Sequence, residues 1–147
     1  MRPGGPAGAP GAGERDLAVL LRSLRPALRP GEFTYRHLPP GSTSADVPAG
    51  LVPAATVAEE EGLTLVLPAE RAGELGEPVG EDERYAWISL EVRSALDAVG
   101  LTAALTTALA AAGVPANVLA GRFHDHVLVP VGRAEEAVAV IAALSER

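Results

Sequence analysis

The residues that could do chemistry are concentrated in two short stretches of the second half of the chain. Residues 97–102 read Asp-Ala-Val-Gly-Leu-Thr, and Gly100 stands directly before an apolar, periodic segment. A helix that begins there would present unpaired backbone N–H groups and a partial positive charge to a ligand carboxylate. Gly100 would let a ligand approach the backbone closely, and Asp97 could accept hydrogen bonds from an ammonium group. The alternative is a plain strand-to-helix turn that uses glycine for its dihedral angle.

The second stretch is the triplet His124-Asp125-His126. In an extended segment both imidazoles would point the same way. A metal site needs three or more ligands, and nothing in the pattern places His37, the remaining histidine, nearby. We therefore expect no metal site. A hairpin turn in which Asp125 bonds to the local backbone is one interpretation, and a ligand pocket lined by His124 is another.

Composition excludes many kinds of catalysis. The 147 residues include no cysteine, and all 12 basic residues are arginine. The chain therefore has no disulfide framework, thiolate zinc site, cysteine nucleophile, Schiff-base lysine or P-loop lysine. No Ser-His-Asp arrangement, paired carboxylates or glycine-rich phosphate loop has supporting context. We expect a non-catalytic protein without a cofactor.

The net charge and the hydropathy pattern limit which binding partners and which cellular location we expect for the protein. A net charge of -7 with only 3% aromatic residues argues against nucleic acid, which needs basic faces and stacking platforms. Residues 1–13 are rich in Gly, Pro and Ala without an apolar core, which is typical of a disordered tail and not of a signal peptide. Residues 98–121 carry no charge, but their Thr, Gly and Pro residues favour a helix, a break and a buried strand over a membrane span. We expect a cytoplasmic protein.

Hydrophobic periodicity predicts the elements that must position these residues. In the second half it predicts strands and helices in the order β-α-β-β-α, over residues 85–92, 101–112, 115–120, 126–131 and 134–144. In the first half it predicts a helix over residues 14–24 and a strand over residues 32–38. Two further strands are predicted within residues 53–68, on either side of the acidic turn 59–62.

The element order indicates a fold class. From residue 85 it is most of the split βαββαβ unit, in which an antiparallel sheet carries helices on one face. The last strand of that unit is missing after residue 144, and the first half offers three strands. We therefore expect an α+β, ferredoxin-like fold with tandem units at residues 14–80 and 81–147 that complete one another's sheets.

Tyr85 and Trp87 lie on the strand face opposite Ile88 and Leu90. If helices cover the Ile88 face, something else must cover Trp87. A second chain or a partner protein would make Tyr85 and Trp87 interface residues, and the protein would then be an assembly module without a small ligand. Packing against the protein's own N-terminal half is the alternative.

The chain resembles the ACT domain family, and it looks most like small stand-alone bacterial proteins with two tandem ACT-like units. The resemblance spans about residues 15–145 and rests on YAWISLEV, SALDAVGLTAALTTALAAAGVPANVLAG and RFHDHVLVPV in the second half, with LRPGEFTYRHL and EEEGLTLVLP in the first. It implies a ferredoxin-like fold, a ligand-sensing role, and an amino acid or related metabolite bound at an interface between units. A homodimer is also expected. Unlike better-known members, this chain shows no attached enzyme or DNA-binding domain.

The family's usual ligand site is the loop from the first strand to the first helix, with its glycine. The resemblance places that loop at residues 94–102, with Gly100 as the glycine. Asn117, a polar residue in an apolar strand, faces either the ligand or solvent. The predicted ligand-binding residues are Ser94, Asp97, Val99, Gly100, Leu101, Thr102, Asn117 and His124.

Overall fold

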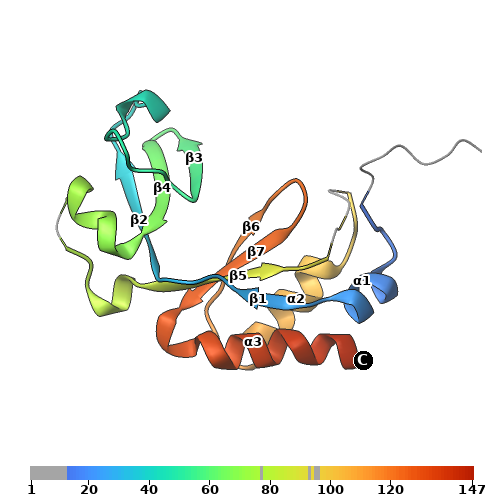
Figure 1. Ribbon diagram of the computed structural model, residues 1–147. Helices are drawn as coiled ribbons and strands as arrows, with labels where there is room; N and C mark the ends of the chain where they lie inside the picture. The colour runs from blue at the N-terminus through green and yellow to red at the C-terminus, as the bar shows by residue number, and fades with distance from the viewer. Residues whose placement is uncertain (1–12, 77, 93, 95–96) are drawn as a thin grey trace, which may run out of the picture.

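The computed structural model describes residues 13–76, 78–92, 94 and 97–147, so nearly all of the predicted N-terminal tail lies outside the described residues. These residues form one antiparallel sheet and three α-helices (Figure 1). The strands are β1 (Pro26–Leu28), β2 (Phe33–Leu38), β3 (Ala55–Glu59), β4 (Gly62–Pro68), β5 (Tyr85–Leu90), β6 (Asn117–Ala120) and β7 (Asp125–Pro130). The helices are α1 (Leu17–Ser23), α2 (Leu101–Ala111) and α3 (Ala134–Ala143), with a 3-10 segment, η2 (Ala69–Leu75), after β4.

The second half has the predicted order β5-α2-β6-β7-α3, and an early segment supplies its missing strand. β1 pairs antiparallel with β5, placing Pro26 opposite Leu90 and Leu28 opposite Ile88. β7 pairs with β5 through a separate set of partners, and β6 pairs with β7. The resulting order β1-β5-β7-β6 is the four-stranded sheet of a ferredoxin-like unit. The sequence did not predict β1, because three residues beginning with proline are too short to show a period.

The larger core lies between this four-stranded part and the helices. In Figure 1, α2 and α3 lie on one side of β1 and β5, away from β2, β3 and β4. Leu20 and Leu24 come from the α1 segment and are fully buried in the same core, so residues 17–28 pack with the second half. The division at residue 80 stays a prediction. The buried members are Leu20, Leu24, Ala86, Ile88, Leu90, Leu101, Leu105, Leu109, Val114, Val127, Val129, Ala137, Ile141 and Leu144.

The rest of the first half is the antiparallel set β3-β4-β2. The β3–β4 hairpin turns at the acidic residues, as predicted, with Glu59 paired opposite Gly62. Alternate residues of β4 point to opposite faces, and Leu63, Leu65 and Leu67 form a small core with Leu51 and Ala72 of the flanking segments. η2 follows β4 directly and supplies Ala72 to this core.

The opposite face of the sheet is covered by the chain itself. Phe33, Val66, Trp87 and Leu128 form a third buried cluster, which we call the aromatic face. The ring centroids of Phe33 and Trp87 are 5.5 Å apart, and Trp87 is only 4% exposed. Of the two predicted environments for Trp87, the structure shows packing against the N-terminal half. Tyr85 joins the same face and contacts Tyr35 edge-on at 5.5 Å.

The uncharged stretch over residues 98–121 becomes α2, a turn at Gly113 and β6. The helix and the break are as predicted, but the prediction of a buried strand is wrong, because β6 ends the sheet and none of its residues is buried. None of the helices in the described residues has the length and apolar character that a bilayer crossing requires.

Candidate functional site

The first candidate site is the loop that joins β5 to α2. Gly100 is the N-cap of α2 and has a left-handed backbone with φ of +103°. Glycine fits that conformation without the Cβ strain of other residues. Among the described residues, no side chain caps this helix end, so the backbone N–H groups of its first turn have no capping acceptor there. Helix α2 therefore offers hydrogen-bond donors and its positive dipole end to an anionic group.

The close approach predicted at Gly100 is made by the protein itself. A Cβ atom added there would lie 2.9 Å from Leu17 Cδ2. The glycine therefore serves both the turn and the packing of α1 against α2. A ligand at this loop would bind beside Leu17, at the helix N–H groups, and not over the glycine Cα.

Asp97 lies in the same loop and is held by Arg15, which stands just before α1. Arg15 Nε donates to Asp97 Oδ1 at 2.9 Å, and both side chains are largely exposed. The hydrogen bond from Arg15 lowers the pKa of Asp97, and the same bond raises the pKa of Arg15. Asp97 is therefore a charged carboxylate at the surface, able to accept from an ammonium group.

Ser94 and His124 are brought together at the other side of this loop. Ser94 Oγ donates to Asp125 Oδ2 at 3.5 Å, and His124 Nδ1 lies 3.4 Å from the carbonyl oxygen of Val92. These contacts join the end of β5 to the tip of the β6–β7 hairpin. Ser94 also forms an isolated bridge with Glu14, so the segment before α1 runs along the same loop.

The other predicted ligand-binding residues differ in their exposure and in their distance from the loop. Val99 is 83% exposed and Thr102 is exposed, so both can touch a ligand. Leu101 is 3% exposed in the larger core, so only its backbone can take part. Asn117 is not brought to the loop. It pairs with Leu128, whose other partner is Trp87, so it lies on the aromatic face at the sheet edge.

The two histidines of the triplet have separate partners. His126 Nδ1 is 2.9 Å from Ser89 Oγ, and its ring centroid is 5.2 Å from that of Trp87. Burial is the main cause that lowers the pKa of His126, and His124 adds to it by charge repulsion. In the described part of the chain, no group of three or more His, Cys, Asp or Glu residues is placed to hold a metal ion.

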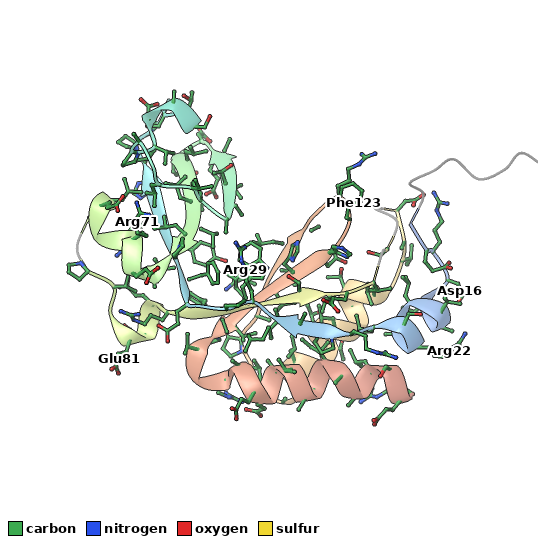
Figure 2. All side chains as sticks on the ribbon, viewed as in Figure 1. Asp16, Arg22, Arg29, Arg71, Glu81 and Phe123 are labelled. Carbon is green, nitrogen blue, oxygen red and sulfur yellow. The ribbon has the colours of Figure 1, made fainter. Side chains whose placement is uncertain are left out.

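The sequence analysis did not identify Arg29 as a site residue. Arg29 lies where the strands β3, β4 and β2 meet the strands β1, β5, β7 and β6 (Figure 2). Its guanidinium carbon lies 5.0 Å from the ring centroid of Phe33 and 5.1 Å from that of Trp87. The only local signal was the turn Arg-Pro-Gly, which marks a connection and not a charge placed on aromatic rings. No residue spacing links Arg29 to Trp87, because the contact is made by the fold.

Comparison with known proteins identifies the two halves separately. Residues 12–80 match a family model of an ACT domain, and residues 82–144 match a second ACT domain model. A protein of unknown function from Vibrio cholerae, described as a possible transport protein, is 39% identical and has a TM-score of 0.75, covering 88% of this chain and 95% of that chain. No curated protein matches the chain.

Two further solved structures share the fold at low identity. The regulatory subunit of aspartate kinase from Thermus flavus is 15% identical with a TM-score of 0.61, covering 82% of this chain and 96% of that chain. The corresponding subunit from Thermus thermophilus, in its ligand-free form, is 14% identical with a TM-score of 0.60, covering 81% and 96%. The ferredoxin-like architecture predicted from the sequence is therefore confirmed.

Proposed function

This chain belongs to the ACT domain family, and from that premise we propose that it is a non-catalytic regulatory module that binds an amino acid or a closely related metabolite. ACT domains are regulatory modules for small ligands, which supports the general role. The choice of an amino acid rests on the loop between β5 and α2.

The observation that carries this proposal is the pairing of two opposite charges at that loop. The uncapped first turn of α2 suits a carboxylate, and the exposed, ionised Asp97 suits an ammonium group. An α-amino acid carries both groups. Its ammonium group would replace the guanidinium of Arg15 at Asp97, and its side chain would lie toward Val99 and Thr102.

This arrangement also suggests how binding would be sensed. Arg15 directly precedes the N-cap Asp16 of α1, and α1 contributes Leu20 to the larger core. A ligand that displaces Arg15 would release the start of α1 from the loop. Ligand binding would then change the surface formed by residues 13–17, and a partner protein could recognise that change.

Binding to the full chain is the direct test. We expect at least one of the twenty standard amino acids to give saturable heat by titration calorimetry and to raise the melting temperature. Asp97→Asn should weaken that binding about tenfold or more, because a charge-assisted hydrogen bond is lost. Glu135→Gln, an exposed acid on α3, is the matched control and should bind as wild type does. Absence of binding by folded protein, or unchanged affinity in Asp97→Asn, would overturn the proposal.

The homodimer expected from the family stays a proposal, and the sheet edges offer a surface for it. β3 ends the sheet on one side and is mostly exposed, with Val57 at 43%. An unpaired edge strand presents free backbone donors and acceptors to a second copy. Light scattering on the purified chain tests this, and Val57→Lys should shift a dimer toward the monomer. A monomer at all concentrations would contradict it.

A further inference from the structure

We propose a second ligand site, at the junction of the two parts of the sheet, for a small molecule that carries a carboxylate at one end and a protonated amine at the other. Arg29 would hold the carboxylate and Glu70 the amine. The site shares no residue with the β5–α2 loop, so it stands independently of the function proposed above.

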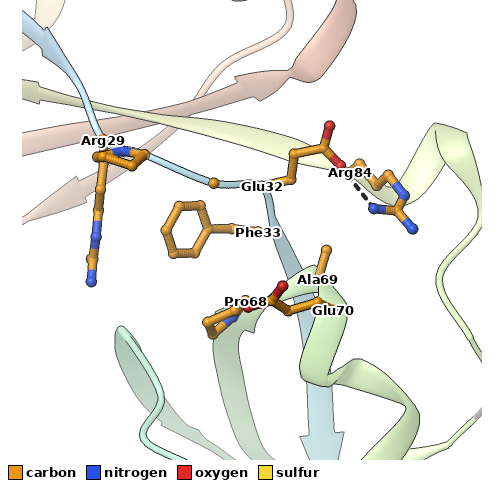
Figure 3. A pocket seen from close by; sticks show the side chains of 9 residues that line it. Arg29, Glu32, Phe33, Pro68, Ala69, Glu70 and Arg84 are labelled. Atoms are coloured by element: carbon orange, nitrogen blue, oxygen red, sulfur yellow. Dashed lines mark hydrogen bonds and ion pairs between the residues drawn. The ribbon is translucent and has the colours of Figure 1, made fainter.

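The site is a cavity of about 420 Å³ (Figure 3). Its walls come from the connection between β1 and β2, from the end of β4 with the start of η2, and from Arg84 just before β5. Phe33 and Pro68 are opposite each other in the β2–β4 pairing and form an apolar floor. The volume suits a small metabolite.

Arg29 lines this cavity and is exposed to solvent. Its guanidinium lies over the rings of Phe33 and Trp87, and it makes no ion pair with any carboxylate in the described residues. Stacking on two rings restricts the orientation of the guanidinium. A carboxylate could then receive two parallel hydrogen bonds from a fork that is already oriented.

The other charged side chains that line the cavity favour a ligand with both a positive and a negative group. Arg84 and Glu32 neutralise each other through a bond of 2.8 Å from Arg84 Nη1 to Glu32 Oε2. Glu70 makes no ion pair within the described part of the chain, since the neighbouring Arg71 bonds to Glu74. Among the described residues that line the cavity, Arg29 and Glu70 are therefore the charged side chains without an ion-pair partner, and Glu70 also interacts by charge with the neighbouring Arg71. A second carboxylate on the ligand would be repelled by Glu70, and a second amine by Arg29.

The position of these two charges indicates the shape of the ligand. In the view of Figure 3, Arg29 and Glu70 lie on either side of the Phe33 ring, with Pro68 beneath it. A ligand with methylene groups between its carboxylate and its amine would place them over this apolar floor. An ω-amino carboxylate has that form, while an α-amino acid, whose charges share one carbon, does not.

The protein contains its own reporter for this site. Trp87 is the chain's single tryptophan, and Arg29 lies on its ring. A carboxylate that binds Arg29 should alter the emission of Trp87. We would titrate the full chain with 4-aminobutyrate and compare it with butyrate, butylamine and glycine at equal ionic strength. We expect a saturable change with 4-aminobutyrate at concentrations about tenfold lower than with any of the other three.

Two variants assign the ends of the ligand. Arg29→Met keeps the apolar stem over the rings and should weaken 4-aminobutyrate binding about tenfold or more, measured by calorimetry. Glu70→Gln should weaken 4-aminobutyrate binding about tenfold and bring its affinity close to that of butyrate. Arg22→Met removes an exposed arginine from α1 and is the control, with no change expected. Circular dichroism confirms that each variant is folded.

Each alternative outcome overturns the proposal. If butyrate binds as well as 4-aminobutyrate to the wild type, Glu70 plays no part; if glycine does, the charge separation is irrelevant. A Trp87 response that survives Arg29→Met places the ligand elsewhere. Asp97→Asn separates this site from the loop, because it should leave the 4-aminobutyrate response intact while it weakens amino acid binding at the loop.

Discussion

The helix-covered part of the molecule and the hairpin part use the same sheet but bury very different amounts of apolar surface. The helix-covered part comprises β1, β5, β6, β7 and the three helices, and its core contains fourteen buried residues among those that the structure describes. The hairpin part comprises β2, β3, β4 and η2, and its own core has five. A core of five residues is too small to hold three strands alone, so the hairpin part depends on the aromatic face that it shares with β5 and β7.

The largest effect should come from truncating matched leucines in the two cores. Leu105 in α2 and Leu65 in β4 are both fully buried. Leu105→Ala should lower the free energy of unfolding by about 3 to 5 kcal/mol, because the surrounding close-packed core cannot collapse around the cavity. Leu65→Ala should cost about 2 to 3 kcal/mol, since its smaller core can relax. Chemical denaturation measures both values.

Hydrogen exchange sharpens the same comparison. After Leu65→Ala, amides of β3 and β4 should lose more protection than those of β5 and β7. After Leu105→Ala, protection should fall across the whole sheet. Equal loss in both parts after Leu65→Ala would show that the hairpin part does not open separately, and the contrast would be wrong.

One glycine in each part allows the cost of a Gly→Ala substitution to be compared between the hairpin part and the helix-covered part. Gly62 and Gly100 both have positive φ, of +139° and +103°. A Cβ atom at Gly62 would overlap the carbonyl oxygen of Leu38, which is backbone, whereas one at Gly100 meets the flexible end of Leu17. We expect Gly62→Ala to cost about 3 kcal/mol and Gly100→Ala about 1 to 2 kcal/mol by thermal unfolding.

A double variant tests the cause at Gly100. Leu17→Ala should make Gly100→Ala less costly, because the clash is removed and only the dihedral strain remains. Costs that simply add would mean that Leu17 and Gly100 are not coupled.

The smallest effect is a pH dependence at the boundary between the parts. The pKa of His126 is lowered, chiefly by burial, so the unfolded chain takes up its proton more readily than the folded one. Stability should therefore fall as the pH drops below the usual histidine value of about 6.5, and it should gain nothing from this group above that pH. Urea denaturation at pH 5.5 and 7.5 measures the difference. His126→Gln should reduce it, and an unchanged difference would refute the assignment.

Much of the fold could be predicted because its signals are local. The alternation in β5 and the apolar stripe of α2 each require only neighbouring residues, and the structure places both where they were expected. β1 could not be found this way, because only pairing with β5 makes those three residues a strand. The cover over Trp87 was likewise left open, since it depends on where the first half folds.

The residues of the candidate sites also differ in whether the sequence alone could identify them. Ser94, Asp97 and His124 were predicted together, and the structure gathers them around one loop because the hairpin tip contacts the end of β5. Asn117 was grouped with them on chemistry, but strand pairing carries it to the aromatic face. Arg29 carried no motif, and its partners are 4 and 58 residues away in the chain.

By itself the sequence determined most of the element types, the ferredoxin-like order of the second half and the chemistries that are excluded. These follow from periodicity and from residue types that are present or absent. Only the tertiary structure decided that β1 completes the second unit, that Leu17 fills the space at Gly100, and that Arg29 rests on Phe33 and Trp87. Those contacts join residues far apart in the chain, and their energies exist only once the sheet has folded.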